Sequence, residues 1–284
     1  MTGASMRTLT VADGTTLAYR AFAAAHGFGD GIPVVLLHAT LSASVQLAGL
    51  ARLLAARGPV LVLDRRGSGE SVVAISRPLD VAVHVADVAA LLDAENVAAA
   101  ILVGHSFGGV VALEAATRLP GRVCAAVAWE PPYGPLADAV TRVAFGAVGV
   151  ATERAYTNGG AAAAAAAFLD GVAGAGAWAA LPDRARAFLS AQGAGAFADA
   201  LLVGLDPAGL ARITAPVTVL TGTASEPFYA PIARTVAARI PGARLVTVDG
   251  LRHPAPITDP EPVAAAVLDA IALAGIPATL EVIR

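Results

Sequence analysis

The sequence contains no lysine, and all 19 of its basic residues are arginine. A Schiff base to pyridoxal phosphate or to a carbonyl substrate needs a lysine amine, so both of these chemistries are excluded. A phosphate-binding loop that ends in Gly-Lys is excluded for the same reason. Two large classes of enzyme are thereby ruled out before any motif is considered.

Cysteine and charged residues are also scarce. Cys124 is the only cysteine, which excludes an intramolecular disulfide and a cysteine-rich metal site. Charged residues make up only 14% of the chain, and the net charge of −3 includes no block of like charge. This pattern does not indicate a nucleic-acid partner. The first residues lack the basic start and apolar run of a secretory signal, which predicts a cytoplasmic location.

Long uninterrupted hydrophobic runs, of the length that spans a bilayer, are missing too, although 56% of the residues are hydrophobic. The longest charge-free run, 96–113, is about as long as a bilayer span. It contains His105 and three glycines at the point where its pattern changes from strand to helix. We therefore expect no membrane partner. Much of the apolar excess is alanine, which favours helices but buries little surface per residue.

Short apolar runs alternate with segments of helical period along most of the chain. The runs are 34–38, 60–66, 99–104, 124–130, 217–222 and 244–250. This alternation predicts an α/β fold in which helices cover both faces of a mostly parallel sheet. We expect covering helices at 42–58 and 80–94. Two short runs around Asp13-Gly14 predict an antiparallel hairpin that leads into the sheet.

The strand rhythm stops at residue 131 and resumes at Pro216. We therefore expect a core formed by residues 1–130 and 216–284, interrupted by a helical lid at 131–215 over the carboxyl edge of the sheet. The alternative is that the alanine tract 161–167 is a low-complexity linker. The lid is favoured because aromatic residues recur in this segment and need a buried environment.

A possible nucleophile lies in the sequence "GHSFGG", 104–109. A Gly-x-Ser-x-Gly turn between a strand and a helix predicts an exposed hydroxyl at Ser106. The glycines at 104 and 108 would permit the sharp turn. A reactive serine also needs a base, an acid that orients the base, and N–H groups that stabilise the oxyanion. The alternative is a small residue in a tight turn, but the pattern lies where the mechanism requires it.

Four motifs, taken in order, resemble the α/β-hydrolase family. They are "VVLLHAT" at 34–40, "VLVLDRRGSGES" at 60–71, "GHSFGG" at 104–109 and the segment 240–267. The resemblance covers nearly the whole chain and implies the α/β-hydrolase fold with a serine nucleophile. It also implies an oxyanion hole formed by the N–H of Phe107 and that of Thr40 or Ala39. The Asp64-Arg65-Arg66-Gly67 segment is expected to be structural, because an arginine near a carboxylate usually forms an ion pair.

The base is predicted to be His253, which follows the last predicted strand. The other histidines are His26, His38, His84 and His105. By resemblance the acid would follow the 217–222 strand, but Ser225 occupies that position and cannot hold an imidazolium. Some branches of the family carry the acid one strand earlier, which favours Glu130 as the acid. Glu226 is the alternative.

These features predict a serine hydrolase that cleaves a small to medium apolar ester, lactone or thioester through an acyl-enzyme. The reaction would need no metal and no organic cofactor. His38, Phe145 and Trp178 are expected to line the substrate pocket. One alternative is a non-hydrolytic enzyme of the same fold, such as a lyase, a cyclase or a cofactor-free perhydrolase. The other is an inactive ligand-binding member of the family. No oligomeric state is predicted.

Overall fold

The computed structural model describes residues 4–23 and 32–276. Eight strands form one sheet in the order β1-β2-β4-β3-β5-β6-β7-β8. The strands are β1 (Ser5–Thr10), β2 (Thr16–Phe22), β3 (Val34–Leu37), β4 (Val60–Leu63), β5 (Ala100–His105), β6 (Val123–Trp129), β7 (Val217–Gly222) and β8 (Arg244–Val248). Strands β3 to β8 run parallel to one another. Strand β2 pairs antiparallel with β4 and, on its other side, with β1, with which it forms the hairpin predicted around Asp13-Gly14. The predicted α/β architecture is confirmed.

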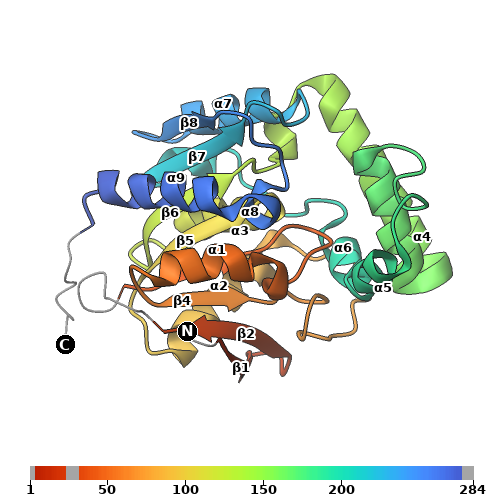
Figure 1. Cartoon of the computed structure of the whole chain (residues 1–284), viewed down its shortest axis with the longest axis horizontal. Coiled ribbons are helices and arrows are strands. Elements are labelled where there is room, and N and C mark those ends of the chain that lie inside the picture. Colours follow the sequence, from red (N-terminus) through yellow and green to blue (C-terminus); the bar gives the residue numbers. More distant parts are fainter. Residues whose placement is uncertain (1–3, 24–31, 277–284) are drawn as a thin grey trace.

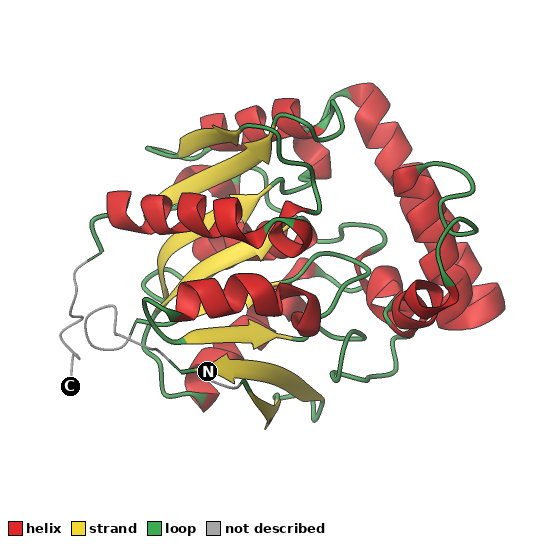
Figure 2. Ribbon diagram, in the orientation of Figure 1, coloured by secondary structure: helices red, strands yellow, loops and turns green. Residues whose placement is uncertain are grey.

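Helices cover both faces of the sheet (Figure 2). One face packs against α1 (Ala48–Ala55) and α9 (Pro260–Leu273), and the other against α2 (Val81–Ala94), α3 (Phe107–Arg118) and α7 (Tyr229–Arg239). Alternate residues of β3 divide between the two cores, since Val34 and Leu36 face α1 while Val35 and Leu37 face α3. This division explains why the central strands are apolar without interruption.

The expected helix at 42–58 is shorter than predicted and begins with a turn of 3-10 helix. This turn, η2 (Ser44–Leu47), leads directly into α1. The strand expected at 60–66 ends at Leu63, and the chain then turns sharply, with the Ser68 N–H donating to the carbonyl of Arg65 at 3.0 Å. The element types were thus predicted more accurately than their ends.

Three helices occupy the segment between β6 and β7, which we call the insertion (residues 131–215). They are α4 (Ala139–Ala173), α5 (Asp183–Ala191) and α6 (Gly193–Asp199), and two 3-10 turns flank them, η3 (Gly134–Leu136) and η4 (Gly209–Arg212). Figure 1 shows these helices grouped beyond the carboxyl ends of the parallel strands. The helical character of the segment follows the prediction, and its role as a lid stays a prediction.

The alanine tract 161–167 lies inside α4 and is not a linker. Ala164 and Ala165 are fully buried, and α4 packs closely on α6, since a Cβ on Gly193 would lie 1.8 Å from the carbonyl oxygen of Ala161. The helix breaks at Gly160, which has a φ of 71°. The small alanine side chains of this tract therefore allow α4 and α6 to approach each other closely.

Candidate active site

Ser106 lies on a sharp turn between β5 and α3, at the carboxyl edge of the sheet. Its backbone has φ 54° and ψ −121°, a region that residues other than glycine rarely adopt. The neighbouring backbone holds this conformation. The Ser106 N–H donates to the carbonyl of Trp129 at 2.8 Å, and its own carbonyl accepts from the N–H of Gly109 at 2.8 Å. The turn has the form of a nucleophile elbow.

Close backbone contacts explain the two glycines of the turn. A Cβ on Gly104 would lie 2.1 Å from the carbonyl oxygen of Gly108, and a Cβ on Gly108 would lie 2.1 Å from the carbonyl oxygen of Leu37. A side chain at either position would force α3 away from β5 or β3. The Gly-x-Ser-x-Gly spacing is therefore a packing requirement of the elbow.

The side chains of Glu130 and His253 are hydrogen-bonded to each other. His253 lies between β8 and the short helix α8 (Ala255–Thr258), and its Nδ1 is 2.8 Å from Oε2 of Glu130. Glu130 directly follows β6 and is completely buried. Its other oxygen, Oε1, accepts from the Thr221 hydroxyl at 2.9 Å and from the Gly222 N–H at 2.8 Å. The carboxylate thus joins the ends of β6 and β7 to the loop after β8.

Hydrogen bonding keeps Glu130 ionised despite its burial. Burial alone raises the pKa of this carboxyl, but the hydrogen bonds from His253 and Gly222 outweigh it, so the pKa lies below its ordinary value of 4.5. An ionised carboxylate can only accept hydrogen bonds, so Nδ1 of His253 carries the hydrogen of this contact. In the neutral ring Nε2 is then free to accept a proton.

Three further side chains fix His253, and none of them was predicted for this purpose. The ring of Tyr229 stacks on the imidazole with centroids 4.1 Å apart and planes at 8°. Nε1 of Trp129 donates to the backbone carbonyl of His253 at 3.0 Å, and Nε2 of His105 lies 3.0 Å from the same oxygen. Burial lowers the pKa of His105 well below its ordinary value, so the ring is neutral and donates from Nε2.

A cavity of about 330 Å³ opens beside Ser106, between the core and the insertion. Its apolar wall is formed by Phe145 together with Val140, Val148, Phe168, Val172, Leu202 and Phe228, and the substrate-binding role expected for Phe145 stays a prediction. Besides Tyr229, polar side chains in the wall come from Thr40, Ser106, Thr141 and Asp199. A cavity with this wall is suited to an apolar, uncharged ligand.

Two of the three residues expected to form the oxyanion hole line this cavity together with Ser106. They are Thr40, in the loop after β3, and Phe107, the first residue of α3. The N–H of Phe107 has no partner within its own helix, as is general for the first turn. Ala39 is buried and does not line the cavity. The structure therefore favours Thr40 over Ala39 as the second donor.

His38 does not line the cavity, contrary to the sequence prediction. Its side chain is completely buried. Its Nε2 accepts the N–H of Arg65 at 2.9 Å, and its Nδ1 donates to the carbonyl of Ala39 at 2.8 Å. Burial lowers the pKa of His38 to about 3, so the ring is neutral. The residue shapes the loop rather than the pocket.

Trp178 and Glu226 also lie away from the predicted site. Trp178 is partly buried against a small cluster formed by Leu41, from the loop after β3, and Ala165 and Ala196 of the insertion, and it does not line the cavity. Glu226 is exposed just before α7, while Glu130 makes the contact with His253. Of the other histidines, His84 is buried on α2, and His26 lies outside the described residues.

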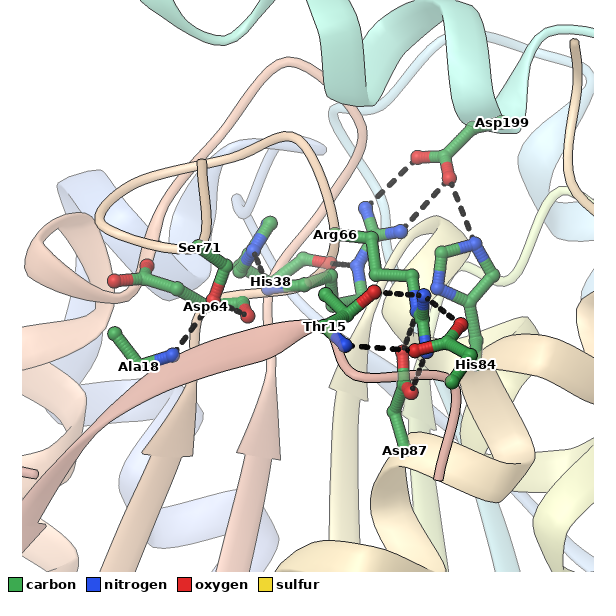
Figure 3. A network of polar contacts seen from close by, with 11 residues as sticks. Thr15, Ala18, His38, Asp64, Arg66, Ser71, His84, Asp87 and Asp199 are labelled. Atoms are coloured by element: carbon green, nitrogen blue, oxygen red, sulfur yellow. Dashed lines mark hydrogen bonds and ion pairs between the residues drawn. The ribbon is translucent and has the colours of Figure 1, made fainter. Parts of the chain in front are cut away.

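A buried polar network surrounds the Asp64-Arg65-Arg66 segment after β4 (Figure 3). Arg66 makes two hydrogen bonds to Asp87, at 2.7 and 2.8 Å, and one to Asp13 at 2.7 Å. Arg65 pairs with Asp199. These ion pairs fit the structural role expected for the segment. The involvement of Asp199, which comes from the insertion, was not predicted.

Comparison with known proteins identifies the family. The model of the alpha/beta hydrolase family matches residues 25–266. With the sheet order and the elbow described above, this match shows that the chain belongs to the alpha/beta hydrolase family. Among the residues that the structure describes, no helix has the length and hydropathy that crossing a membrane requires.

Curated relatives match parts of the chain. A non-heme chloroperoxidase from Streptomyces lividans is 39% identical over 127 residues, which is 43% of this chain and 43% of the relative. A putative carbamate hydrolase, RutD, from Variovorax paradoxus is 38% identical over 112 residues, which is 38% of this chain and 42% of the relative. The match thus spans less than half the length of each relative.

Solved structures match nearly the whole fold. The enol-lactonase from Burkholderia xenovorans has a TM-score of 0.75 at 22% identity, with 94% of this chain and 100% of that chain covered. A thermophilic esterase from Thermogutta terrifontis has a TM-score of 0.74 at 21% identity, with 95% and 99% covered. At these identities the likeness concerns the fold alone.

Proposed function

We propose that this protein is a serine hydrolase that cleaves small to medium apolar esters, lactones or thioesters through an acyl-enzyme. The observation that carries the proposal is the hydrogen bond between Glu130 and His253, near an elbow that presents Ser106 to an apolar cavity. The same contact argues against an inactive ligand-binding protein, since that alternative rested on the missing acid at Ser225.

In the proposed reaction, Oγ of Ser106 attacks the substrate carbonyl carbon while Nε2 of His253 takes the hydroxyl proton. The ionised Glu130 holds the imidazole in the required tautomer and stabilises its protonated form. The oxyanion accepts hydrogen bonds from the N–H groups of Phe107 and Thr40. His253 then protonates the leaving group. Water attacks the acyl-enzyme in the second half, with His253 again as the base.

The apolar wall of the cavity supports a neutral substrate. Asp199 is the carboxylate in the wall, and Arg65 already neutralises it. A substrate carboxylate would therefore enter a low-dielectric space without a free cation to pair with. We expect neutral short- and medium-chain esters to be better substrates than esters whose acyl group ends in a carboxylate.

Intact mass after treatment with a fluorophosphonate tests the proposal. The wild type is expected to gain one adduct and to hydrolyse 4-nitrophenyl butyrate. The Ser106→Ala variant should do neither, while keeping the wild-type circular dichroism spectrum. A folded wild type that shows no adduct and no hydrolysis across a panel of esters would contradict the proposal.

A second candidate is transfer of the same acyl group to hydrogen peroxide. The 39% identity with a non-heme chloroperoxidase supports it. In this reaction peroxide replaces water, and its oxygen attacks the acyl carbon to release a peracid in place of the acid. The yield of peracid from an acetate ester in the presence of peroxide measures how the acyl-enzyme divides between the two acceptors.

A further inference from the structure

Arg65 contacts both segments that would form the oxyanion hole. Its Nε donates to the carbonyl oxygen of His38 at 3.1 Å, and its Nη2 donates to that of Ala39 at 3.1 Å. Its Cζ also lies 5.0 Å from the centroid of the Phe107 ring, which is within the range of a cation–π contact. One buried guanidinium therefore connects the loop after β3 with the start of α3.

The two carbonyl contacts determine the direction of the N–H groups in the loop. The carbonyl of His38 and the N–H of Ala39 belong to one peptide group. The carbonyl of Ala39 and the N–H of Thr40 belong to the next. The described chain has no cis peptide bond, and in a planar trans peptide the C=O and N–H bonds point in opposite directions. The N–H groups of Ala39 and Thr40 are therefore directed away from Arg65. Of these two residues, Thr40 lines the cavity.

Arg65 is held in turn by Asp199, the last residue of α6 in the insertion. Nη1 donates to Oδ1 and Nη2 to Oδ2, both at 2.8 Å. Such paired contacts fix the plane of a guanidinium. The hydroxyl of Thr40 donates to Oδ2 of the same carboxylate at 2.8 Å, and Nε2 of His84 lies 3.4 Å from Oδ1. Figure 3 shows Asp199 reaching the network from the insertion.

A purely stabilising ion pair is the competing explanation. Buried ion pairs are weak contributors to stability, because apolar side chains of similar volume often replace both partners without loss. Arg66 and Asp87 form such a pair beside Arg65, and the contacts of Arg66 are to Asp87, Asp13 and Thr15. The contacts to the carbonyls of His38 and Ala39 distinguish Arg65 from its neighbour.

We propose that Arg65 and Asp199 are positioning residues that orient the backbone N–H of Thr40 towards the cavity, so that packing of the insertion on the core completes the oxyanion hole. This inference rests on the proposed function. It assigns no contact with substrate to either residue. The insertion then contributes to catalysis through a carboxylate that never meets the reacting atoms.

The double variant Arg65→Met/Asp199→Leu tests the proposal, because it removes the pair without leaving an unpaired buried charge. The matched control is Arg66→Met/Asp87→Leu, the same exchange at the neighbouring pair. We expect the first variant to lower kcat for 4-nitrophenyl butyrate about 10- to 100-fold, with KM within about threefold, since an oxyanion donor acts mainly in the transition state. The control should stay within about twofold of the wild type.

Two further readouts separate positioning from a structural effect. The pH profile of kcat/KM should keep its shape in Arg65→Met/Asp199→Leu, because Glu130 and His253 are untouched. Hydrogen exchange of the peptide that covers residues 38–41 should become faster in this variant and not in the control. Arg65→Lys should not restore kcat, because one ammonium cannot replace the fork of five donors.

Wild-type kcat in Arg65→Met/Asp199→Leu, or an equal loss in the control, would overturn the proposal. Unchanged exchange of residues 38–41 would overturn it even if the protein hydrolyses no ester, because that measurement does not depend on activity. Failure of the proposed function is recognised separately, by a wild type that gains no fluorophosphonate adduct at Ser106.

Discussion

Ser225 occupies the position where the family pattern usually has an aspartate, and the carboxylate of Glu130 lies against His253 instead. The resemblance to family branches that carry the acid one strand earlier allowed this exchange to be predicted, because Glu130 ends the apolar run that follows the elbow. It did not predict Tyr229, which stacks on the same imidazole. Stacking depends on how α7 leans over the loop after β8, and no local pattern encodes that packing.

Replacing Glu130 with glutamine should lower kcat/KM for 4-nitrophenyl butyrate by about 100- to 10,000-fold, since the amide cannot stabilise the imidazolium. Initial rates at pH 7 measure the effect. Glu226→Gln serves as the control and is expected within about twofold of the wild type, because Glu226 is exposed and Glu130 already occupies Nδ1 of His253. If Glu226→Gln proves the slower variant, the assignment of the acid is wrong.

The stacked ring of Tyr229 should contribute a smaller factor. Aromatic stacking is worth about 0.5–1.5 kcal/mol, which corresponds to a factor of about 2–10 in rate. Tyr229→Leu is therefore expected to lower kcat by about that factor, and Tyr229→Phe, which keeps the ring, should retain the wild-type kcat. Equal kcat values for the two variants would show that stacking does not matter.

Among the helices and strands, the repeating pattern of the core was predictable, but the internal structure of the insertion was not. Short continuous apolar runs mark the central strands, which are buried on both faces. A period of 3.6 residues marks the helices that cover the sheet. Helix α4 packs on α6 through alanine and glycine, so α4 shows no strong apolar stripe. The Asn158-Gly159-Gly160 sequence is a local signal for the break at Gly160. No break was predicted there from the sequence.

The contact between α4 and α6 can be tested with two glycines. Gly193→Ala should lower the free energy of unfolding by about 1–3 kcal/mol, because its Cβ would meet the Ala161 carbonyl. Gly146→Ala, on α4 with no atom near the added Cβ, should raise it by up to about 1 kcal/mol through helix propensity. Urea titrations measure both changes. A stable Gly193→Ala variant would mean that the two helices can separate at little cost.

At the scale of the whole molecule, Arg65 and Asp199 join the insertion to the core, and this link should respond to acid. Burial raises the pKa of Asp199, but the attraction and hydrogen bonds of Arg65 and His84 outweigh it, so the pKa lies well below its ordinary value of 3.8. A carboxyl whose pKa is lower in the folded protein than in the unfolded protein stabilises the fold at pH values above its unfolded pKa. This stabilisation is lost as the pH falls from the unfolded pKa towards the folded pKa.

Urea titrations at pH 6 and pH 3 measure this link. Between these values the wild type should lose about 1 kcal/mol of unfolding free energy relative to Arg65→Met/Asp199→Leu, which lacks the titrating pair. Other carboxyls titrate in both proteins, so their effects cancel in the comparison. A difference between the two proteins that does not change with pH would contradict the depressed pKa of Asp199.

The chain order of the site has a consequence for how the protein is made. Ser106 and Glu130 precede the insertion, and His253 follows it. Because synthesis proceeds from the N-terminus, the ribosome completes the elbow and all three insertion helices before it reaches the histidine. On the proposed function, Ser106 of a nascent chain has no base to activate its hydroxyl until the insertion that surrounds the cavity has been synthesised. An immature polypeptide therefore has no activated hydroxyl to expose to the esters and thioesters of the cell.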